Sequence, residues 1–452
     1  MEERSRRWIA GAAIAVPILF LVIQKASINA ASMQPEPVRK GKALAAAKPA
    51  SSASSAAQAS AINLAALGLP GALGASAPAA PGCMRKPSAD PLSLASPADN
   101  RRVLDRMNRA LSASGDARLS AAAGMLDVSG RGMGEIVSAM EQGEKACSGS
   151  KANEASPACR EARESQVAAH AHRGELLSPV ADKLARMARD GKDPLVYAMA
   201  MQACRPSSAD VSAPACGQLS TEQWARLDPD NGVAWLKMLE EAMARSDMGT
   251  AAEALHRLSQ AKRVESPGFM VTRLVLRNLP ADLTGDERLF AMMQSSVVWM
   301  QWQMPGYQPL VKMCSPQAVR DANRAQTCEA VAHLLVEGDQ SALGNLVGLR
   351  VGENLGWPAA KVQDMRTEVQ AALMASPGLA LSTDKPVNTC ELTRQMQDWL
   401  ALVSEKGEVK GSQEYAKRAG VSIDQLKADY LRRMEVTTAA RQATAASAPE
   451  RL

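Results

Sequence analysis

The sequence predicts an all-helical fold, built as an array of antiparallel helical hairpins. Aromatic residues make up 3% of the 452-residue chain and include only three Phe, whereas Met occurs 23 times. Strands favour β-branched and aromatic residues, while Ala, Leu, Met, Glu and Gln favour helices. No run of alternating apolar and polar residues lies between turn dipeptides, as sheet strands would require. Frequent helix-start signals separated by short breaks instead indicate neighbouring helices packed as hairpins.

Residues 1–25 are predicted to form a cytoplasmic end followed by a transmembrane anchor. Three arginines precede an apolar run of 16 residues, from Trp8 to Ile23. A spanning helix uses about 17–25 apolar residues, and flanking basic residues favour the cytoplasmic side. The chain would then be a single-pass protein of the bacterial inner membrane, with its main domain in the periplasm. The alternative is a cleaved signal peptide, which would release the domain into the periplasm.

Residues 26–97 consist mostly of Ala, Ser, Pro and Gly and are predicted to form a disordered linker. Such a composition buries too little apolar surface to offset the entropy cost of ordering. Residues 98–440 then form the helical domain, with an alternative division into two parts near 280–310, and residues 441–452 form a disordered tail. The net charge of +5 is small for this length and does not favour a nucleic-acid partner.

Helix starts in the domain are marked by two kinds of signal. In one, Ser is followed by Pro, which tolerates the first helical turn because its missing N–H has no partner there. In the other, Ser or Thr is followed three residues later by Glu or Gln, the spacing of a capping box. The predicted starts are Ser96, Ser178, Ser220, Ser266, Thr284 and Ser422, and the predicted breaks are 114–116, 190–191 and 337–339.

Residues 227–262 carry the one repeat-like signature of the chain. An LDPDN loop precedes Trp235, and Ala251 and Leu255 occupy small and large packing positions in the second half of the stretch. The stretch resembles a tetratricopeptide repeat, which implies a helical hairpin in a tetratricopeptide-like or irregular α-solenoid. It departs from the family at Leu239, where a small residue is usual. No second clear copy appears, although a solenoid needs about three units.

The wider pattern, a Cys-rich helical pair followed by this Trp- and Pro-containing loop, is similar to uncharacterised envelope proteins of proteobacteria. That resemblance implies a location at the cell envelope and no particular activity.

The eight cysteines are predicted to form structural disulfides. Three local couples are separated by 12, 12 and 14 positions, and each couple flanks a polar stretch that breaks a helix. An even count suits an oxidising compartment. Metal binding is disfavoured because no CxxC motif or nearby His couple exists, and redox-active pairs usually lie closer together. The predicted bridges are Cys147–Cys159, Cys204–Cys216 and Cys314–Cys328, with Cys83–Cys390 as the remaining pair.

Two groups of apolar residues are candidates for binding a partner. The concave face of the repeat-like unit would present Trp235, Met238 and Leu255. Trp299 and Trp302 lie in a cluster rich in Trp and Met, residue types that serve as interface anchors and also fill irregular cores. The sequence therefore predicts a non-catalytic, membrane-tethered periplasmic protein that binds an envelope protein or peptide. No catalytic residue, metal, cofactor or nucleic acid is predicted.

Two other functions remain open at this stage. One is an envelope hydrolase without a recognisable motif, since no nucleophile-elbow sequence is present. The other follows from residues 414–426, whose Ala–x₃–Gly-Val-Ser–x₃–Leu spacing resembles a helix-turn-helix DNA reader. That resemblance implies a transmembrane regulator. Its basic residues are nearly balanced by acidic ones, which weakens attraction to phosphates and favours a plain helical hairpin.

Overall fold

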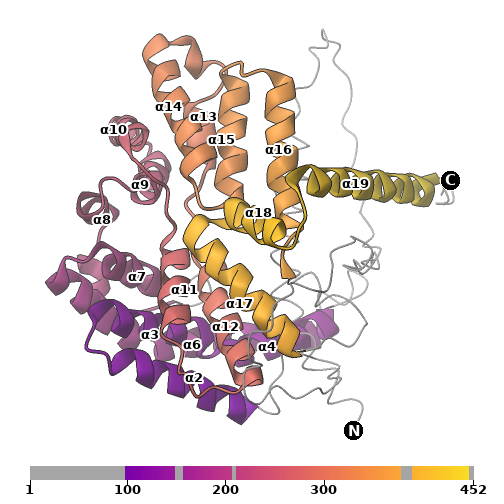
Figure 1. Cartoon of the computed structure of the whole chain (residues 1–452). Helices are drawn as coiled ribbons and strands as arrows, with labels where there is room; N and C mark the ends of the chain where they lie inside the picture. Colours follow the sequence, from indigo (N-terminus) through magenta and orange to yellow (C-terminus); the bar gives the residue numbers. More distant parts are fainter. Residues whose placement is uncertain (1–96, 148–155, 206–209, 378–388, 447–452) are drawn as a thin grey trace.

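The computed structural model describes residues 97–147, 156–205, 210–377 and 389–446, and the fold of these ranges is helical throughout (Figure 1). Their only β-type pairing consists of two isolated bridges, Asn231–Arg263 and Val264–Asp339. The predicted all-helical class is thus confirmed for these ranges. The predicted anchor and linker lie outside the described residues. Within the described ranges, no helix combines the length and the apolar character needed to cross a bilayer.

The helices of the N-terminal part pack on one another along the chain. Helix α2 packs on α3, α3 packs on α6 and α7, and α4 packs on α6. Asp116 and Asp193 cap the starts of α3 and α7 with their carboxylates, which accept hydrogen bonds from backbone N–H groups of the first turn. The bounds are α2 (Pro97–Ser112), α3 (Ala117–Gly130), α4 (Met133–Cys147), α6 (Pro157–Gly191) and α7 (Pro194–Cys204).

Helix α6 runs through Pro179 without a break, so the helix start predicted at Ser178 is wrong. A proline inside a helix removes one backbone hydrogen bond and disfavours the preceding turn. Here the Ser178 hydroxyl donates to the Gly174 carbonyl at 2.8 Å. Buried residues lie on both sides of the proline, from Ala162 to Leu184, where α6 packs on its neighbours. These tertiary contacts outweigh the local preference for a break.

Arg173 is the largest fully buried side chain, with 1% of its surface exposed. Its guanidinium donates from Nε to the Arg131 carbonyl at 2.8 Å and from a terminal nitrogen to the Val128 carbonyl. Those carbonyls end α3, where the helix leaves acceptors without intrahelical donors. Burial lowers the pKa of Arg173 from its ordinary value. The residue therefore fastens α6 to the end of α3, at the turn where Gly132 adopts a φ of 70°.

The middle of the chain follows the predicted starts at Ser220, Ser266 and Thr284. The Thr284 and Glu287 pair forms a complete capping box. Residues 227–262 form a helical hairpin in which Leu239, Ala251 and Leu255 are fully buried; the tetratricopeptide-like assignment stays a prediction. The elements are η2 (Pro214–Gln218), α8 (Thr221–Leu227), α9 (Gly232–Ala244), α10 (Met248–Gln260), α11 (Pro267–Arg277), α12 (Gly285–Met300) and α13 (Gln308–Met313).

In the C-terminal part, α14, α15 and α16 lie side by side, and α18 crosses near their lower ends in Figure 1. Helix α19 packs on α16 and then projects from the body. It continues to Ala446, so the predicted tail begins at least six residues too early. The bounds are η3 (Ala318–Arg320), α14 (Ala322–Gly338), α15 (Ala342–Asn354), α16 (Ala359–Leu373), α17 (Thr389–Lys406), α18 (Glu408–Arg418) and α19 (Ile423–Ala446).

The main core cluster draws buried residues from α2 to α15, between Val103 and Val351. A second cluster joins α12 to α17 through Leu289, Met292 and Met396. Because α12 contributes to both clusters, it bridges the region near 280–310 where the alternative division was expected.

Three disulfides join the couples predicted from their spacing. Cys147–Cys159, Cys204–Cys216 and Cys314–Cys328 have Cα–Cα distances of 4.9, 5.6 and 5.7 Å. These bridges indicate an oxidising environment, such as the periplasm or the cell exterior. Cys390 is also disulfide-bonded, but its predicted partner Cys83 lies outside the described residues.

Candidate functional site

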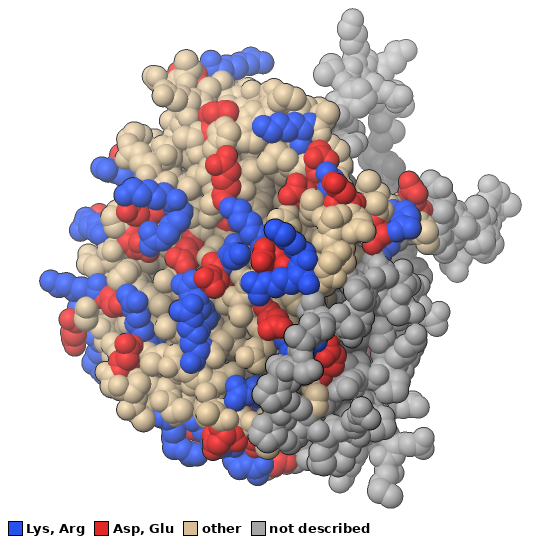
Figure 2. All heavy atoms as spheres, viewed as in Figure 1, with Lys and Arg blue, Asp and Glu red and all other residues tan. Residues whose placement is uncertain are grey.

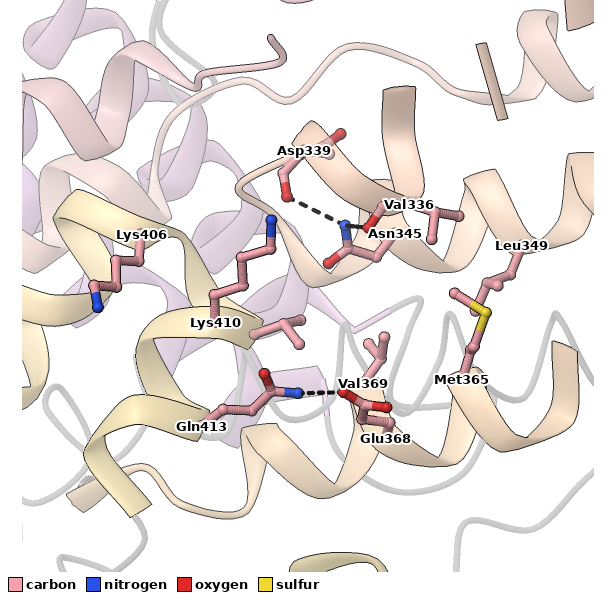
Figure 3. Close-up of a pocket in the computed structure, with 11 residues that line it drawn as sticks. Val336, Asp339, Asn345, Leu349, Met365, Glu368, Val369, Lys406, Lys410 and Gln413 are labelled. Atoms are coloured by element: carbon pink, nitrogen blue, oxygen red, sulfur yellow. Dashed lines mark hydrogen bonds between the residues drawn. The ribbon is translucent and has the colours of Figure 1, made fainter. Parts of the chain in front are cut away.

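A pocket of about 120 Å³ opens among the helices of the C-terminal part (Figure 3). Helices α14 and α15 form one wall, and α16, α17 and α18 form the others. Five of its side chains are apolar, and Leu349 and Val369 among them are buried. The lining residues are Val336, Asp339, Asn345, Leu349, Met365, Glu368, Val369, Lys406, Val409, Lys410 and Gln413.

Asn345 is the most unusual residue of the pocket, because it is polar and only 6% exposed. Its Nδ2 donates to the backbone carbonyls of Leu335 at 2.8 Å, Val336 at 3.3 Å and Asp339 at 3.2 Å. Carbonyl oxygens only accept hydrogen bonds, so this side of the amide must be the nitrogen. Oδ1 is therefore on the opposite side. It accepts no hydrogen bond from the part of the chain that the structure describes.

Gln413 and Glu368 form the facing wall, on α18 and α16. Gln413 Nε2 donates to Glu368 Oε1 at 2.8 Å. That bond orients both side chains and leaves Gln413 Oε1 and Glu368 Oε2 without a donor among the described residues. Figure 3 shows the two amides, from Asn345 and Gln413, on opposite sides of the pocket.

Asp339 lies where the pocket meets the turn between α14 and α15. Its Oδ2 accepts from the Tyr307 hydroxyl at 3.0 Å, and its Oδ1 accepts from the Ser341 backbone N–H at 2.7 Å and hydroxyl at 2.9 Å. Burial raises the pKa of Asp339 to about 7, although the Ser341 hydrogen bonds lower it. Burial also raises the pKa of Tyr307, with a further contribution from the Asp339 charge.

Glu408 ties the start of α18 to the start of α15. Its Oε2 accepts from the Ala342 backbone N–H at 2.6 Å, and its own N–H donates to the Gln340 carbonyl at 2.7 Å. Burial and the nearby Asp339 charge raise the pKa of Glu408 to about 7. Both carboxyls are thus held by backbone and hydroxyl groups, and burial nevertheless favours their neutral forms. We name Asp339, Glu408, Tyr307 and Ser341 the carboxyl latch.

The five residues predicted to bind a partner are placed elsewhere. Leu255 is fully buried, and Trp235 and Trp302 are 9% and 7% exposed, so these three side chains pack mainly in the core. Met238 and Trp299 are half-buried. None of the five lines the pocket, and a binding role for any of them stays a prediction.

Trp299 belongs to a packed aromatic group that also holds Phe269 and Trp399. Its ring centroid lies 4.5 Å from that of Phe269 and 6.3 Å from that of Trp399. Adding a Cβ at Gly268 would bring it to 3.1 Å from both Trp299 and Trp302. We name Phe269, Trp299 and Trp399 the aromatic cluster. Its rings fill space between α11, α12 and α17.

The segment resembling a DNA reader folds as two helices joined at Gly420, whose φ is 78°. Ser422 caps α19, and its reciprocal bond with Gln425 forms the predicted capping box. The second helix packs on α16, where the Tyr430 hydroxyl donates to Gln370 at 2.7 Å. Figure 2 shows basic and acidic side chains interspersed over the visible face, with neither sign gathered into one continuous patch.

Comparisons with known proteins found no matching family model, no similar curated protein and no similar solved structure.

Sequence reasoning missed the pocket because its residues carry no motif. They come from α14 to α18 and are brought together only by tertiary packing. The single available signal was the break at 337–339, which places Asp339 at a helix junction. Asn345 lies inside a helix, where a polar residue usually signals a solvent-exposed face.

Proposed function

We propose that this chain is a membrane-tethered periplasmic protein that binds a protein or peptide at the cell envelope without catalysing a reaction. The observation that carries the proposal is the composition of the pocket, which combines apolar walls with amide oxygens that accept no hydrogen bond from the described residues. Binding sites commonly pair apolar lining with a few oriented polar groups.

The pocket favours binding over hydrolysis because of how its acidic groups are used. Asp339 is held by Ser341 and Tyr307, and Glu368 is held by Gln413. A hydrolytic site needs a nucleophile or an activated water next to a general base. No His, Cys or Ser is among the lining residues in the described part of the chain, so the arrangement supports recognition rather than acid–base chemistry.

The periplasmic location rests on two independent features. The three disulfides suit an oxidising compartment, and the apolar run preceded by three arginines suits a membrane anchor with its N-terminus inside the cell. An anchor followed by a long linker would let the helical domain reach partners away from the bilayer surface.

Photocrosslinking in intact cells tests the proposal. A photoreactive amino acid replaces Lys406, an exposed residue at the pocket, and in a matched control it replaces Val167, which is 70% exposed on α6. We expect a discrete crosslinked envelope polypeptide from position 406 and not from position 167. Equal crosslinking from both positions, or none from position 406, would contradict the proposal. A C-terminal reporter active only inside the cell would refute the location.

A further inference from the structure

Three side-chain oxygens of the pocket accept no hydrogen bond from the described residues, although the lysines Lys406 and Lys410 also line it. Asn345 is more than nine-tenths buried. Its Nδ2 donates hydrogen bonds to three backbone carbonyls, and its Oδ1 has no hydrogen-bond partner among the described residues. Across the pocket, Gln413 Oε1 and Glu368 Oε2 also accept no hydrogen bond from the described residues, in side chains that are half-buried. These oxygens are accessible to solvent, so a ligand that supplies N–H donors can take the place of water there.

We propose that this pocket binds the ammonium group of a lysine side chain presented by the partner polypeptide. This deepens the proposed function by naming the group that the partner inserts. An ammonium has three N–H donors and no acceptor, and the pocket offers three acceptor groups: two amide oxygens and one carboxylate. The carboxylate of Glu368 supplies the opposite charge, which strengthens such hydrogen bonds.

The apolar lining matches the rest of a lysine side chain. Val336, Leu349, Met365, Val369 and Val409 surround the pocket, and the methylene stem of lysine packs well on apolar surface while its charged head finds polar partners. A cavity of about 150 Å³ accommodates a benzene ring. A pocket of about 120 Å³ therefore has room for one slender side chain and excludes a bulky one.

Other charged groups fit less well. A carboxylate ligand would face Glu368 and two amide oxygens, all of them acceptors. A guanidinium is planar and prefers a carboxylate with both oxygens available, whereas one oxygen of Glu368 is taken by Gln413. The pocket's own lysines do not fill the site. Lys410 donates to the Glu337 carbonyl at 2.6 Å, and Figure 3 shows the Lys406 ammonium directed away from the pocket.

The test uses the full-length chain labelled with ¹³C at its methionine methyl groups, with the Met365 signal assigned from Met365→Leu. The probes are n-butylammonium, butyrate, 1-butanol and two short capped peptides that differ only in whether their single lysine is acetylated. We expect n-butylammonium and the lysine peptide to shift the Met365 signal saturably. Butyrate and the acetyl-lysine peptide should leave it unchanged, and 1-butanol should bind at least tenfold more weakly than n-butylammonium.

Two variants make the test specific. Glu368→Gln keeps the shape of the side chain and removes its charge, and we expect it to weaken n-butylammonium binding by about tenfold. Glu405→Gln makes the same charge change at an exposed position of α17 that does not line the pocket, and it should leave the affinity unchanged. Helical circular dichroism and thermal unfolding of both variants identify any loss of binding caused by misfolding.

Several results would overturn the inference. Butyrate or 1-butanol binding as tightly as n-butylammonium would show that the ammonium is not recognised. An equal loss of affinity in both variants would show a general charge effect. Binding of n-butylammonium without binding of the lysine peptide would assign the pocket to a small free amine. These outcomes differ from failure of the proposed function, in which the pocket binds the lysine peptide but no envelope partner crosslinks to position 406.

Discussion

The aromatic cluster and the pocket are both built where α17 or α18 meets earlier helices, yet they have opposite characters. The aromatic cluster has rings in contact and a glycine, Gly268, whose Cβ would be crowded. The pocket has aliphatic walls and amide oxygens that accept no hydrogen bond within the described part of the chain. In a domain with so few aromatic residues, these large rings fill the space between α11, α12 and α17. The open site arises instead where polar residues keep neighbouring helices from closing.

This difference separates stability from recognition within one domain. Changes in the aromatic cluster should lower the free energy of unfolding and leave ligand binding at the pocket intact. Changes of Glu368 and Gln413 at the pocket should do the reverse. Asn345, which is buried and donates to three backbone carbonyls, and the carboxyl latch, which holds two helix starts together, should contribute to stability as well.

The largest effect is expected from Phe269→Ala, which removes a side chain that is 1% exposed and stacked on Trp299. Truncation of a buried Phe costs about 3–5 kcal/mol of unfolding free energy through lost burial and the cavity left behind. Chemical denaturation followed by circular dichroism measures it. Met304→Ala, at a position 43% exposed, is the control and should change stability by less than about 0.5 kcal/mol. Similar losses of unfolding free energy in the Phe269→Ala and Met304→Ala variants would show that the aromatic cluster is not a packed core.

The carboxyl latch predicts a pH dependence with a definite sign. Asp339 and Glu408 have pKa values raised from 3.8 and 4.5 to about 7. Their protonated forms are therefore favoured in the fold, and this stabilisation is complete below the unfolded pKa values, falling as the pH rises from about 4 to 7. Each pKa unit is worth about 1.4 kcal/mol, but both carboxyls keep some exposure to solvent. We therefore expect less than the full sum of the two shifts, a loss of roughly 2–4 kcal/mol between pH 4.5 and pH 8.

Denaturation midpoints across that pH range measure the loss. Asp339→Asn, which stays neutral, should flatten the profile, and Glu368→Gln at the pocket should leave it as it is. A profile that rises with pH in the unmodified chain would contradict the raised pKa values.

A smaller effect is expected from the third disulfide, Cys314–Cys328, which closes a loop between α13 and α14 and has both cysteines fully buried. Replacing both cysteines with Ser should lower the free energy of unfolding by about 2–3 kcal/mol, mainly because the unfolded chain gains conformational freedom. The same change at Cys147–Cys159, which joins α4 to α6 away from the pocket, should leave n-butylammonium binding unaltered. A loss of binding in that second variant would show that the two regions are coupled.

The smallest effect is expected from Met238→Ala, at one of the residues that the sequence singled out for binding. If the pocket carries recognition, photocrosslinking from position 406 should be unchanged in this variant. Complete loss of the crosslink would show that the repeat-like unit, residues 227–262, takes part in binding the partner. Recognition would then not be confined to the pocket.

Much of the fold could be predicted from local sequence, because helix starts and disulfides depend on short-range chemistry. The capping pairs Thr284–Glu287 and Ser422–Gln425 fold as expected. The three local cysteine couples were recognisable from spacing across helix breaks. The error at Ser178 shows the limit of such signals, since packing along α6 overrides a proline that would end an isolated helix.

The pocket could not be predicted in this way. Asn345 and Gln413 are 68 positions apart, and neither has a sequence environment that distinguishes it from a solvent-exposed amide. Their role depends on which of their atoms already form hydrogen bonds. Those bonds form only when α14, α15, α16 and α18 pack together. The Trp and Met residues drew attention because they are rare and large, which is also why the core needs them.

The unbroken course of α6 has a mechanical consequence. At about 1.5 Å per residue, the 35 residues of this helix span roughly 50 Å. The Cys147–Cys159 disulfide near the beginning of α6 and the buried guanidinium of Arg173 near its middle therefore belong to one continuous helix. A displacement at the N-terminal end of α6 is therefore transmitted toward the core through one continuous helix, in which Pro179 is the position most prone to bend.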